Sequence, residues 1–146
     1  MNLFGLLQIS GSALLAERER AEISASNLAN AETTRTADGG PYKRQNVIFA
    51  ATHPVSNGFS ATLANFTDIH TQTVEVAGVV QDESDPVRRF EPGHPDADAT
   101  GYVSYPNVNP VEESVNLMEA GRSFQMNVSA IQTTKAMIQA SLSITQ

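Results

Sequence analysis

The sequence predicts an α+β fold in which long N- and C-terminal helices pair as a coiled-coil-like inner domain, with a small antiparallel β segment between them. Apolar residues recur with helical spacing at both ends of the 146-residue chain, and runs rich in Thr, Val and Phe fill the middle. Stretches rich in Pro and Gly separate these parts. A chain of this length forms one ordinary domain, or a small domain with extended arms.

Residues 1–35 are predicted to form the N-terminal helix of the inner domain, with the helix itself over residues 3–30. Leucines, alanines and serines form two neighbouring rows with steps of three or four residues, and small residues let helices approach closely. Two asparagines in these rows could bind a ligand, but such amides more often set the register of a helical interface. We expect an assembly interface at Leu14, Ile23, Asn27, Leu28 and Asn30.

Residues 36–90 are predicted to form a small β-rich outer domain. The runs 45–51, 60–66 and 69–80 are rich in Thr, Val and Phe and are bounded by turns that contain Pro or Gly. They are expected to form a twisted antiparallel sheet. A segment of this size is marginal by itself, because small domains bury only ~60% of the surface of the unfolded chain.

Residues 91–109 are predicted to form a Pro-rich extended connector that leads back to the C-terminal helix. Proline favours an extended, polyproline-like path, and the glycines let the path turn. The two tyrosines are expected to pack the connector against a neighbour. The connector residues are Pro92, Gly93, Pro95, Gly101, Tyr102, Tyr105 and Pro106.

Residues 110–146 are predicted to form the C-terminal helix of the inner domain. Asn109 suits the N-cap, Pro110 suits the first helical position, and two glutamates follow in the first turn, where the helix dipole favours them. Apolar residues then keep a 3.5-residue repeat, which indicates either a coiled-coil seam or one helix of a bundle packed on its own domain. The expected interface residues are Leu117, Phe124, Val128, Ile131, Ile138 and Leu142.

The motif that could support chemistry is His94, Asp96 and Asp98. On a strand these side chains would project from one face, and imidazole with carboxylates could hold a divalent cation. On a polyproline path they would diverge and be solvated or bound to backbone amides. A metal-binding or hydrolytic module using these three residues is therefore the alternative function. Otherwise we expect no cofactor, no metal and no catalytic residue.

Charge and composition exclude several classes of partner and site. The net charge of −7 and the absence of a Lys/Arg run argue against nucleic acid and anionic membranes. The chain has no cysteine, which excludes disulfides and thiolate sites. No basic residue precedes the N-terminal apolar stretch, and no apolar run approaches the ~18–20 residues that span a bilayer. We expect a soluble chain without membrane insertion or a cleaved signal peptide.

Short motifs along the whole chain resemble those of one family. Residues 26–30, Ser-Asn-Leu-Ala-Asn, with Thr33 resemble the N-terminal signature of the bacterial flagellar rod and hook proteins. The blocks 38–42 (Asp-Gly-Gly-Pro-Tyr), 92–97 (Pro-Gly-His-Pro-Asp-Ala) and 106–109 (Pro-Asn-Val-Asn) are similar to a short rod member. The resemblance runs nearly from end to end. Gly121 departs from it, because a better helix former is expected there.

This resemblance implies a structural subunit of the proximal rod of the flagellar basal body. Such chains are exported through the flagellar type III apparatus and assemble helically, with themselves and with other proximal and distal rod proteins. The assembly forms an axial drive shaft around a secretion channel in the periplasmic space. The two helices would line the inner tube, and residues 91–109 would be a structural strap.

Overall fold

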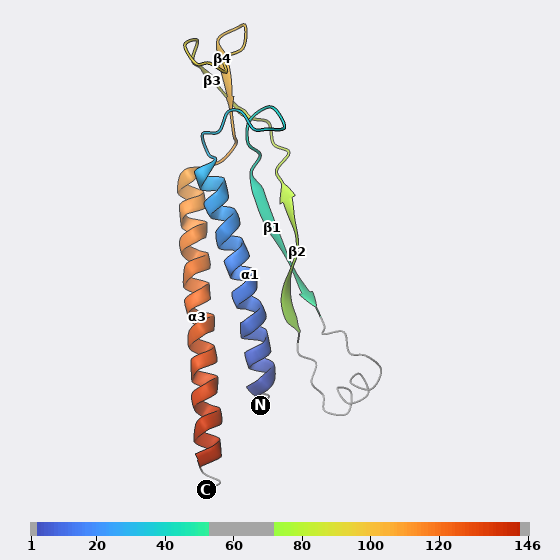
Figure 1. The fold of residues 1–146 in the computed structure, drawn as a ribbon, viewed down its shortest axis with the longest axis vertical. Coiled ribbons are helices and arrows are strands. Elements are labelled where there is room, and N and C mark those ends of the chain that lie inside the picture. Colours follow the sequence, from blue (N-terminus) through green and yellow to red (C-terminus); the bar gives the residue numbers. More distant parts are fainter. Residues whose placement is uncertain (1–2, 53–71, 144–146) are drawn as a thin grey trace. The chain divides into compact units, whose positions relative to one another are not determined.

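The computed structural model describes residues 3–52 and 72–143, and it confirms the α+β fold. Both predicted long helices are present, and the run 45–51 forms a strand as predicted. Most of 69–80 also belongs to a strand, whereas the predicted strand 60–66 lies outside the described residues. The elements are α1 (Leu3–Ala29), β1 (Gln45–Thr52), β2 (Thr73–Gln81), β3 (Val87–Phe90), β4 (Tyr102–Tyr105) and α3 (Pro110–Ser143) (Figure 1).

The chain divides into two compact units. Unit 1 contains Met1–Glu19, Phe49–Ala77 and Ala120–Gln146, and unit 2 contains Arg20–Ile48 and Gly78–Glu119. Each long helix therefore contributes its longer part to unit 1 and its shorter part to unit 2. In unit 1 the Ser12 side chain on α1 accepts a hydrogen bond from the backbone N–H of Val74 on β2, at 3.2 Å. This bond ties the helix to the start of that strand.

In unit 2 the end of α1 and the start of α3 lie side by side and run in opposite directions (Figure 1). Arg20 on α1 forms an ion pair with Glu119 at 3.2 Å, and Asn27 donates a hydrogen bond to Glu113 at 3.2 Å. The later residue of α1 thus meets the earlier residue of α3. The antiparallel pairing fixes the register of the two helices in this unit.

The start of α3 is capped as its sequence predicts. The side-chain oxygen of Asn109 accepts a hydrogen bond from the N–H of Val111 at 3.1 Å, and the Asn109 carbonyl accepts one from the N–H of Glu113 at 3.0 Å. Pro110 occupies the first helical position, where a missing N–H leaves no bond unmade. These bonds hold Glu113 at a defined place in the first turn.

The predicted extended path of residues 91–109 is wrong for its first part, because β3 and β4 form an antiparallel hairpin. Val87 is opposite Tyr105, and Phe90 is opposite Tyr102. The N–H of His94 closes a first turn, in which Pro92 is the second residue. The N–H of Ala97 closes the next turn, in which Pro95 is the second residue. Proline's fixed φ suits that turn position as well as a polyproline path, and strand pairing gives the backbone partners that an extended path lacks.

Replacing Gly101 by alanine is expected to destabilise this hairpin by about 1–3 kcal/mol, the range for a strained backbone position. Gly101 has φ of +81°, and a Cβ there would lie 2.9 Å from Phe90 Cε2 and 3.3 Å from Pro92 Cβ. Amide hydrogen exchange across β3 and β4 measures the loss. Gly93→Ala is the matched control, because a Cβ at Gly93 meets nothing within 4 Å. Equal exchange rates in both variants would show that the position is unstrained.

Candidate assembly site

The buried faces of the two long helices are lined by small side chains. On α1 they include Ser10, Ala16 and Ser24, which are 4%, 4% and 6% exposed. On α3, Ala120 and Thr134 are 0% and 1% exposed and stand fourteen residues apart. Small side chains let helix backbones pack closely, which agrees with the Ala- and Ser-rich rows seen in the sequence. The bulky apolar residues of the two helices lie mostly outside these buried faces.

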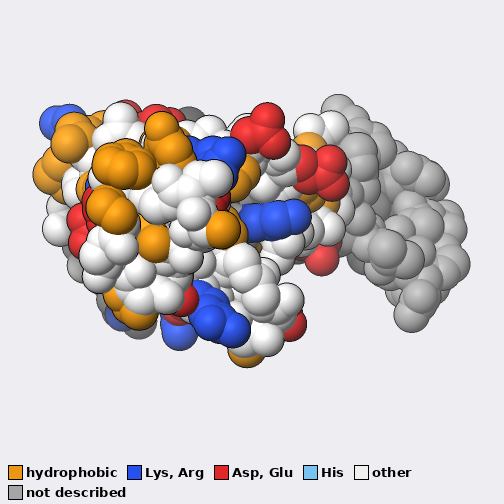
Figure 2. Space-filling view, turned by 90° about the horizontal axis from the view of Figure 1, so that it is seen from above, with side chains coloured by type: hydrophobic (Ala, Val, Ile, Leu, Met, Phe, Trp, Pro, Cys, Tyr) orange, Lys and Arg blue, Asp and Glu red, His pale blue; other side chains and the backbone are white. Residues whose placement is uncertain are grey.

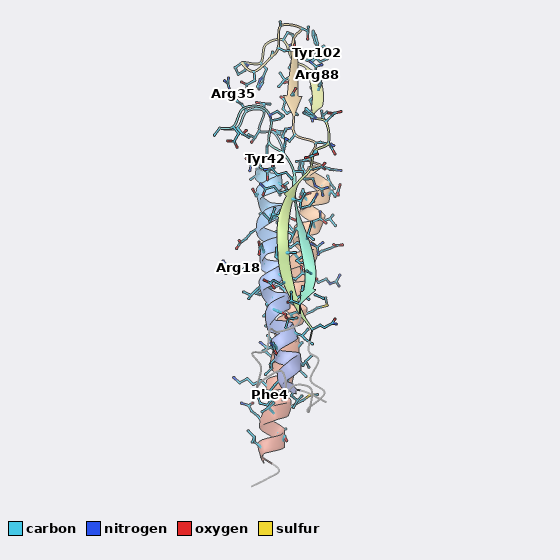
Figure 3. All side chains as sticks on the ribbon, turned by 90° about the vertical axis from the view of Figure 1, so that its right-hand side faces the viewer. Phe4, Arg18, Arg35, Tyr42, Arg88 and Tyr102 are labelled. Carbon is cyan, nitrogen blue, oxygen red and sulfur yellow. The ribbon has the colours of Figure 1, made fainter. Side chains whose placement is uncertain are left out.

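Those bulky apolar residues lie exposed on both helices. Phe4, near the N-terminal end of α1 (Figure 3), is 77% exposed, and Val111 on α3 is 72% exposed. Side chains of this size normally stabilise a fold by leaving water, each by about 1.5–3 kcal/mol when fully buried. Several on two helices therefore mark a surface that fits another protein. The other such residues are Leu6, Ile9, Leu15, Val115, Met118, Phe124, Met126, Met137 and Leu142.

The interface residues expected from the sequence divide into three groups by their exposure. Phe124 and Leu142 are exposed, at 39% and 64%, and are available to a partner. Asn27 is buried within unit 2. The remaining residues are half-buried, so one chain covers them only in part; these are Leu14, Ile23, Leu28, Asn30, Leu117, Val128, Ile131 and Ile138.

Inside unit 2, Asn27 joins three segments. Its side-chain amide donates to the carbonyl of Gln45 at 2.8 Å and accepts from the N–H of the same residue at 2.9 Å. The Tyr42 hydroxyl, at the C-terminal end of α1 (Figure 3), also donates to Asn27, at 2.9 Å. The amide thus pairs with the first residue of β1 as a neighbouring strand would. We call Asn27, Tyr42, Arg44, Gln45 and Glu113 the Asn27 junction.

Glu113 and Arg44 complete the junction with a buried ion pair. Arg44 Nε donates to Glu113 Oε1 at 2.7 Å, and the other carboxylate oxygen accepts from Asn27. Burial by itself lowers the pKa of Arg44, but the hydrogen bond and charge of Glu113, helped by Glu112, outweigh it and raise that pKa. The Arg44 carbonyl also accepts from the N–H of Asp82, which ties the end of β2 to the same point.

Sequence reasoning found only part of this junction. It selected Asn27, but it assigned Glu113 to the helix dipole and gave Arg44 and Tyr42 no role. One signal was present in the sequence: Glu113 precedes Ala120 by seven residues, so it stands on the row of α3 that is buried. A charged residue at a buried heptad position requires a partner of opposite charge, so a basic residue in contact with Glu113 could have been expected.

His94, Asp96 and Asp98 do not converge, because each is engaged in the local structure. His94 Nδ1 accepts from the N–H of Asp96, and Asp96 Oδ2 accepts from the Thr34 hydroxyl at 2.8 Å. Asp98 caps a turn and binds Arg88 at 2.6 Å. Among residues 3–52 and 72–143, no group of three or more metal-ligating side chains could hold an ion. The three residues are part of the hairpin's framework.

The hairpin presents aromatic and basic side chains on its surface. Arg88 lies 5.4 Å from the centre of the Tyr102 ring, and Figure 3 shows these two side chains together. Phe90 packs edge-on against the same ring and is 64% exposed. Seen from above, hydrophobic side chains gather next to basic ones (Figure 2). This face is suited to a protein partner rather than to a small substrate.

The connector residues differ in how deeply they are buried. Tyr105 is 8% exposed, and its hydroxyl donates to Glu91 at 2.8 Å, a bond that raises the pKa of Tyr105. Pro106 is also buried. Exposed or half-buried are Pro92, Gly93, Pro95, Gly101 and Tyr102. Tyr105 and Pro106 thus anchor the segment, while Tyr102 at the start of β4 and the turn residues remain accessible.

The hairpin is expected to loosen in acid as Asp98 is protonated. Hydrogen bonds from the Thr100 hydroxyl and the Tyr102 N–H, with Thr100 N–H and the Arg88 charge, lower the pKa of Asp98 to about 2. A carboxylate with a depressed folded-state pKa stabilises above its unfolded pKa, 3.8, and that contribution is lost as pH falls toward 2. The amide NMR signals of Thr100 and Tyr102 should titrate near pH 2. Asp98→Asn should abolish that step; its persistence would assign it to another group.

The helices were also compared with the requirements of a membrane span. Neither long helix, over the part of the chain that the structure describes, combines the length and apolar character needed to cross a bilayer.

Two family models match the chain at its two ends. The model described as "Flagella basal body rod protein" matches residues 7–35, which lie on α1 and the segment after it. The model described as "Flagellar basal body rod FlgEFG protein C-terminal" matches residues 99–144, which contain β4 and α3. The two matches fall on the segments that meet at the Asn27 junction.

Curated relatives match over the whole length. The chain is 37% identical to the flagellar basal-body rod protein FlgC of Borreliella burgdorferi, over 100% of this chain and 99% of the relative. It is 38% identical to FlgC of Salmonella typhimurium, over 100% of both chains. It is 35% identical to FlgC of Bacillus subtilis, over 99% of both. The chain therefore belongs to the FlgC family of flagellar basal-body rod proteins: it is a structural component of the basal body that assembles with other rod proteins, and not an enzyme.

Proposed function

We infer that this chain is a subunit of the proximal rod, where it forms part of the axial drive shaft and of the wall of the secretion channel. In this proposal residues 1–35 and 110–146 form the inner domain, and the subunit assembles helically with itself and with other proximal and distal rod proteins. Residues 36–90 form the outer domain, and residues 91–109 join the two. The division at residue 90 falls within the β3–β4 hairpin, so the hairpin spans the boundary between outer domain and connector.

The observation that supports this proposal best is the set of bulky apolar side chains left exposed on both long helices. Leu15 on α1 and Met118 on α3 are 70% and 66% exposed, whereas small residues fill the buried faces. Apolar side chains that stay exposed would not stabilise a monomeric enzyme. A subunit of a helical assembly buries them against its neighbours, where apolar area contributes about 25 cal/mol per Å².

Purified basal bodies test the position in the rod. In cells whose own copy is deleted, an epitope-tagged chain should restore rod assembly and be recovered in basal bodies stripped of hook and filament. Electron cryo-microscopy should then place its helices on the inner wall of the proximal rod. Helices on the outside of the rod, or density only in the distal part, would contradict the proposal.

We further infer that the chain reaches the periplasmic space through the flagellar type III apparatus and keeps its N-terminus. Similarity to basal-body rod proteins over the whole chain supports this route. Mass spectrometry of the exported chain should find an uncleaved N-terminal segment, and a block of the type III ATPase should keep the chain in the cytoplasm. Export that persists under the block, or a trimmed N-terminus, would overturn the route.

A further inference from the structure

The Asn27 junction buries polar groups where two helices could have packed on apolar side chains. Asn27 and Glu113 are each 1% exposed. The Asn27 amide uses both N–H donors and both lone pairs, in bonds with Gln45, Tyr42 and Glu113. Glu113 in turn receives Arg44 on one oxygen and Asn27 on the other. A network in which every partner is engaged requires one arrangement of its parts.

Such a network distinguishes arrangements better than it stabilises any one of them. Taking two charges out of water costs about as much as their mutual attraction returns, so apolar replacements of similar volume are often neutral or stabilising. Separating a buried charge from its partner is strongly unfavourable. Arrangements that part Glu113 from Arg44 are therefore penalised, although the observed arrangement gains little net stability from the pair.

The other buried positions on the helices distinguish alignments poorly. Ser10 and Ser24 on α1 are both small and stand fourteen residues apart, which is two heptads. Ala120 on α3 is equally small. Small side chains lack the large knobs that fit only one set of holes on a facing helix. A shift by two heptads would exchange one small side chain for another.

We propose that the Asn27 junction is a register lock, in which the Arg44–Glu113 pair and Asn27 select the alignment of α1 and α3 that brings Arg20 to Glu119. The alignment shifted by two heptads leaves Glu113 without Arg44 and is excluded. The lock acts within a single chain, so it does not depend on the proposed place in the rod. For assembly, the lock would fix the alignment along the helix axes between the exposed apolar residues of α1 and those of α3.

Introduced cysteines report the alignment, because the chain has none of its own. The full-length chain with Arg20→Cys and Glu119→Cys reports the observed alignment, since these side chains meet at 3.2 Å. The chain with Arg20→Cys and Thr133→Cys reports a shift of two heptads, because residue 133 is fourteen positions further along α3. A short thiol cross-linker such as dibromobimane joins each pair, and the yields give the ratio of the two alignments.

The lock is then replaced by apolar side chains, with a matched control. Arg44→Met with Glu113→Leu removes the buried pair and keeps its volume. Lys43→Met with Glu83→Leu removes one base and one acid from exposed positions of the same unit. Far-UV circular dichroism measures the helix content of each chain, so that a loss of folding is not mistaken for a shift of alignment.

In the unaltered chain and in the control, the observed alignment should exceed the shifted one by about tenfold or more. In the Arg44→Met, Glu113→Leu chain, this ratio should fall by about fivefold or more while helix content is unchanged. An unchanged ratio would overturn the lock, because other residues would then set the alignment. Loss of helix content would also overturn it, because the pair would then be a stabiliser.

Discussion

Cells whose only copy carries Phe124→Asp are expected to be non-motile, with rod assembly reduced to background. Phe124 is 39% exposed in the single chain, so an aspartate there stays hydrated and the fold is kept before assembly. In an assembled rod the same carboxylate would enter an apolar interface without a partner, at a cost of several kcal/mol per subunit. Leu142→Asp, at a residue that is 64% exposed, should have the same effect.

The neighbouring exposed residue provides the control. Gln125→Asp adds the same charge to the same helix where a polar side chain already stands, and it should leave motility unchanged. Counts of complete rods in purified basal bodies, with circular dichroism of the free chains, separate assembly from folding. Normal rods in Phe124→Asp cells would mean that this part of α3 contacts no neighbour.

Glu113→Ala is expected to lower the free energy of unfolding by about 1.5–3 kcal/mol, the range for hydrogen bonds to a charged group. Truncation leaves Arg44 without its buried carboxylate, and it leaves one N–H of Asn27 without an acceptor. Asn27 is 1% exposed, so water cannot replace its lost bond, whereas Arg44 is 21% exposed and keeps its contact with Glu112. Urea unfolding followed by far-UV circular dichroism measures the change.

Glu112→Ala is the matched comparison, because Glu112 also binds Arg44, at 3.0 Å, but from a side chain that is 56% exposed. Exposed pairs contribute about 0–1 kcal/mol, so this variant should be nearly as stable as the unaltered chain. Equal losses in the two variants would show that burial of Glu113 does not matter. The double replacement Glu113→Leu with Arg44→Met should keep the free energy of unfolding of the unaltered chain. Truncation by Glu113→Ala should lower it.

The sequence predicted the long helices and β1 because their signals are local. Asn109, Pro110 and the repeat after Leu117 determine where α3 begins and continues, without reference to distant residues. The hairpin was missed because β3 and β4 are short and pair across residues 91–101. Each strand gains its hydrogen bonds only from the other, and proline suits a turn as well as an extended path.

The junction was only partly predictable for a similar reason. An asparagine on an apolar helix row is visible in the sequence, and so is a glutamate in a first helical turn. Their meeting is not visible, because Asn27 and Glu113 are 86 residues apart and Arg44 is 69 residues from Glu113. Only the antiparallel pairing of α1 with α3 brings the three together.

The way in which Asn27 holds Gln45 has a consequence for how the sequence can change. Both of its bonds to Gln45 go to the backbone, so the amide recognises a position in the chain and not the side chain that stands there. Position 45 can therefore accept any residue that forms a strand, whereas position 27 depends on an amide that donates and accepts at once. Aspartate lacks the donors and leucine lacks both. Position 27 on the helix should therefore tolerate few substitutions, whereas position 45 on the strand should tolerate many.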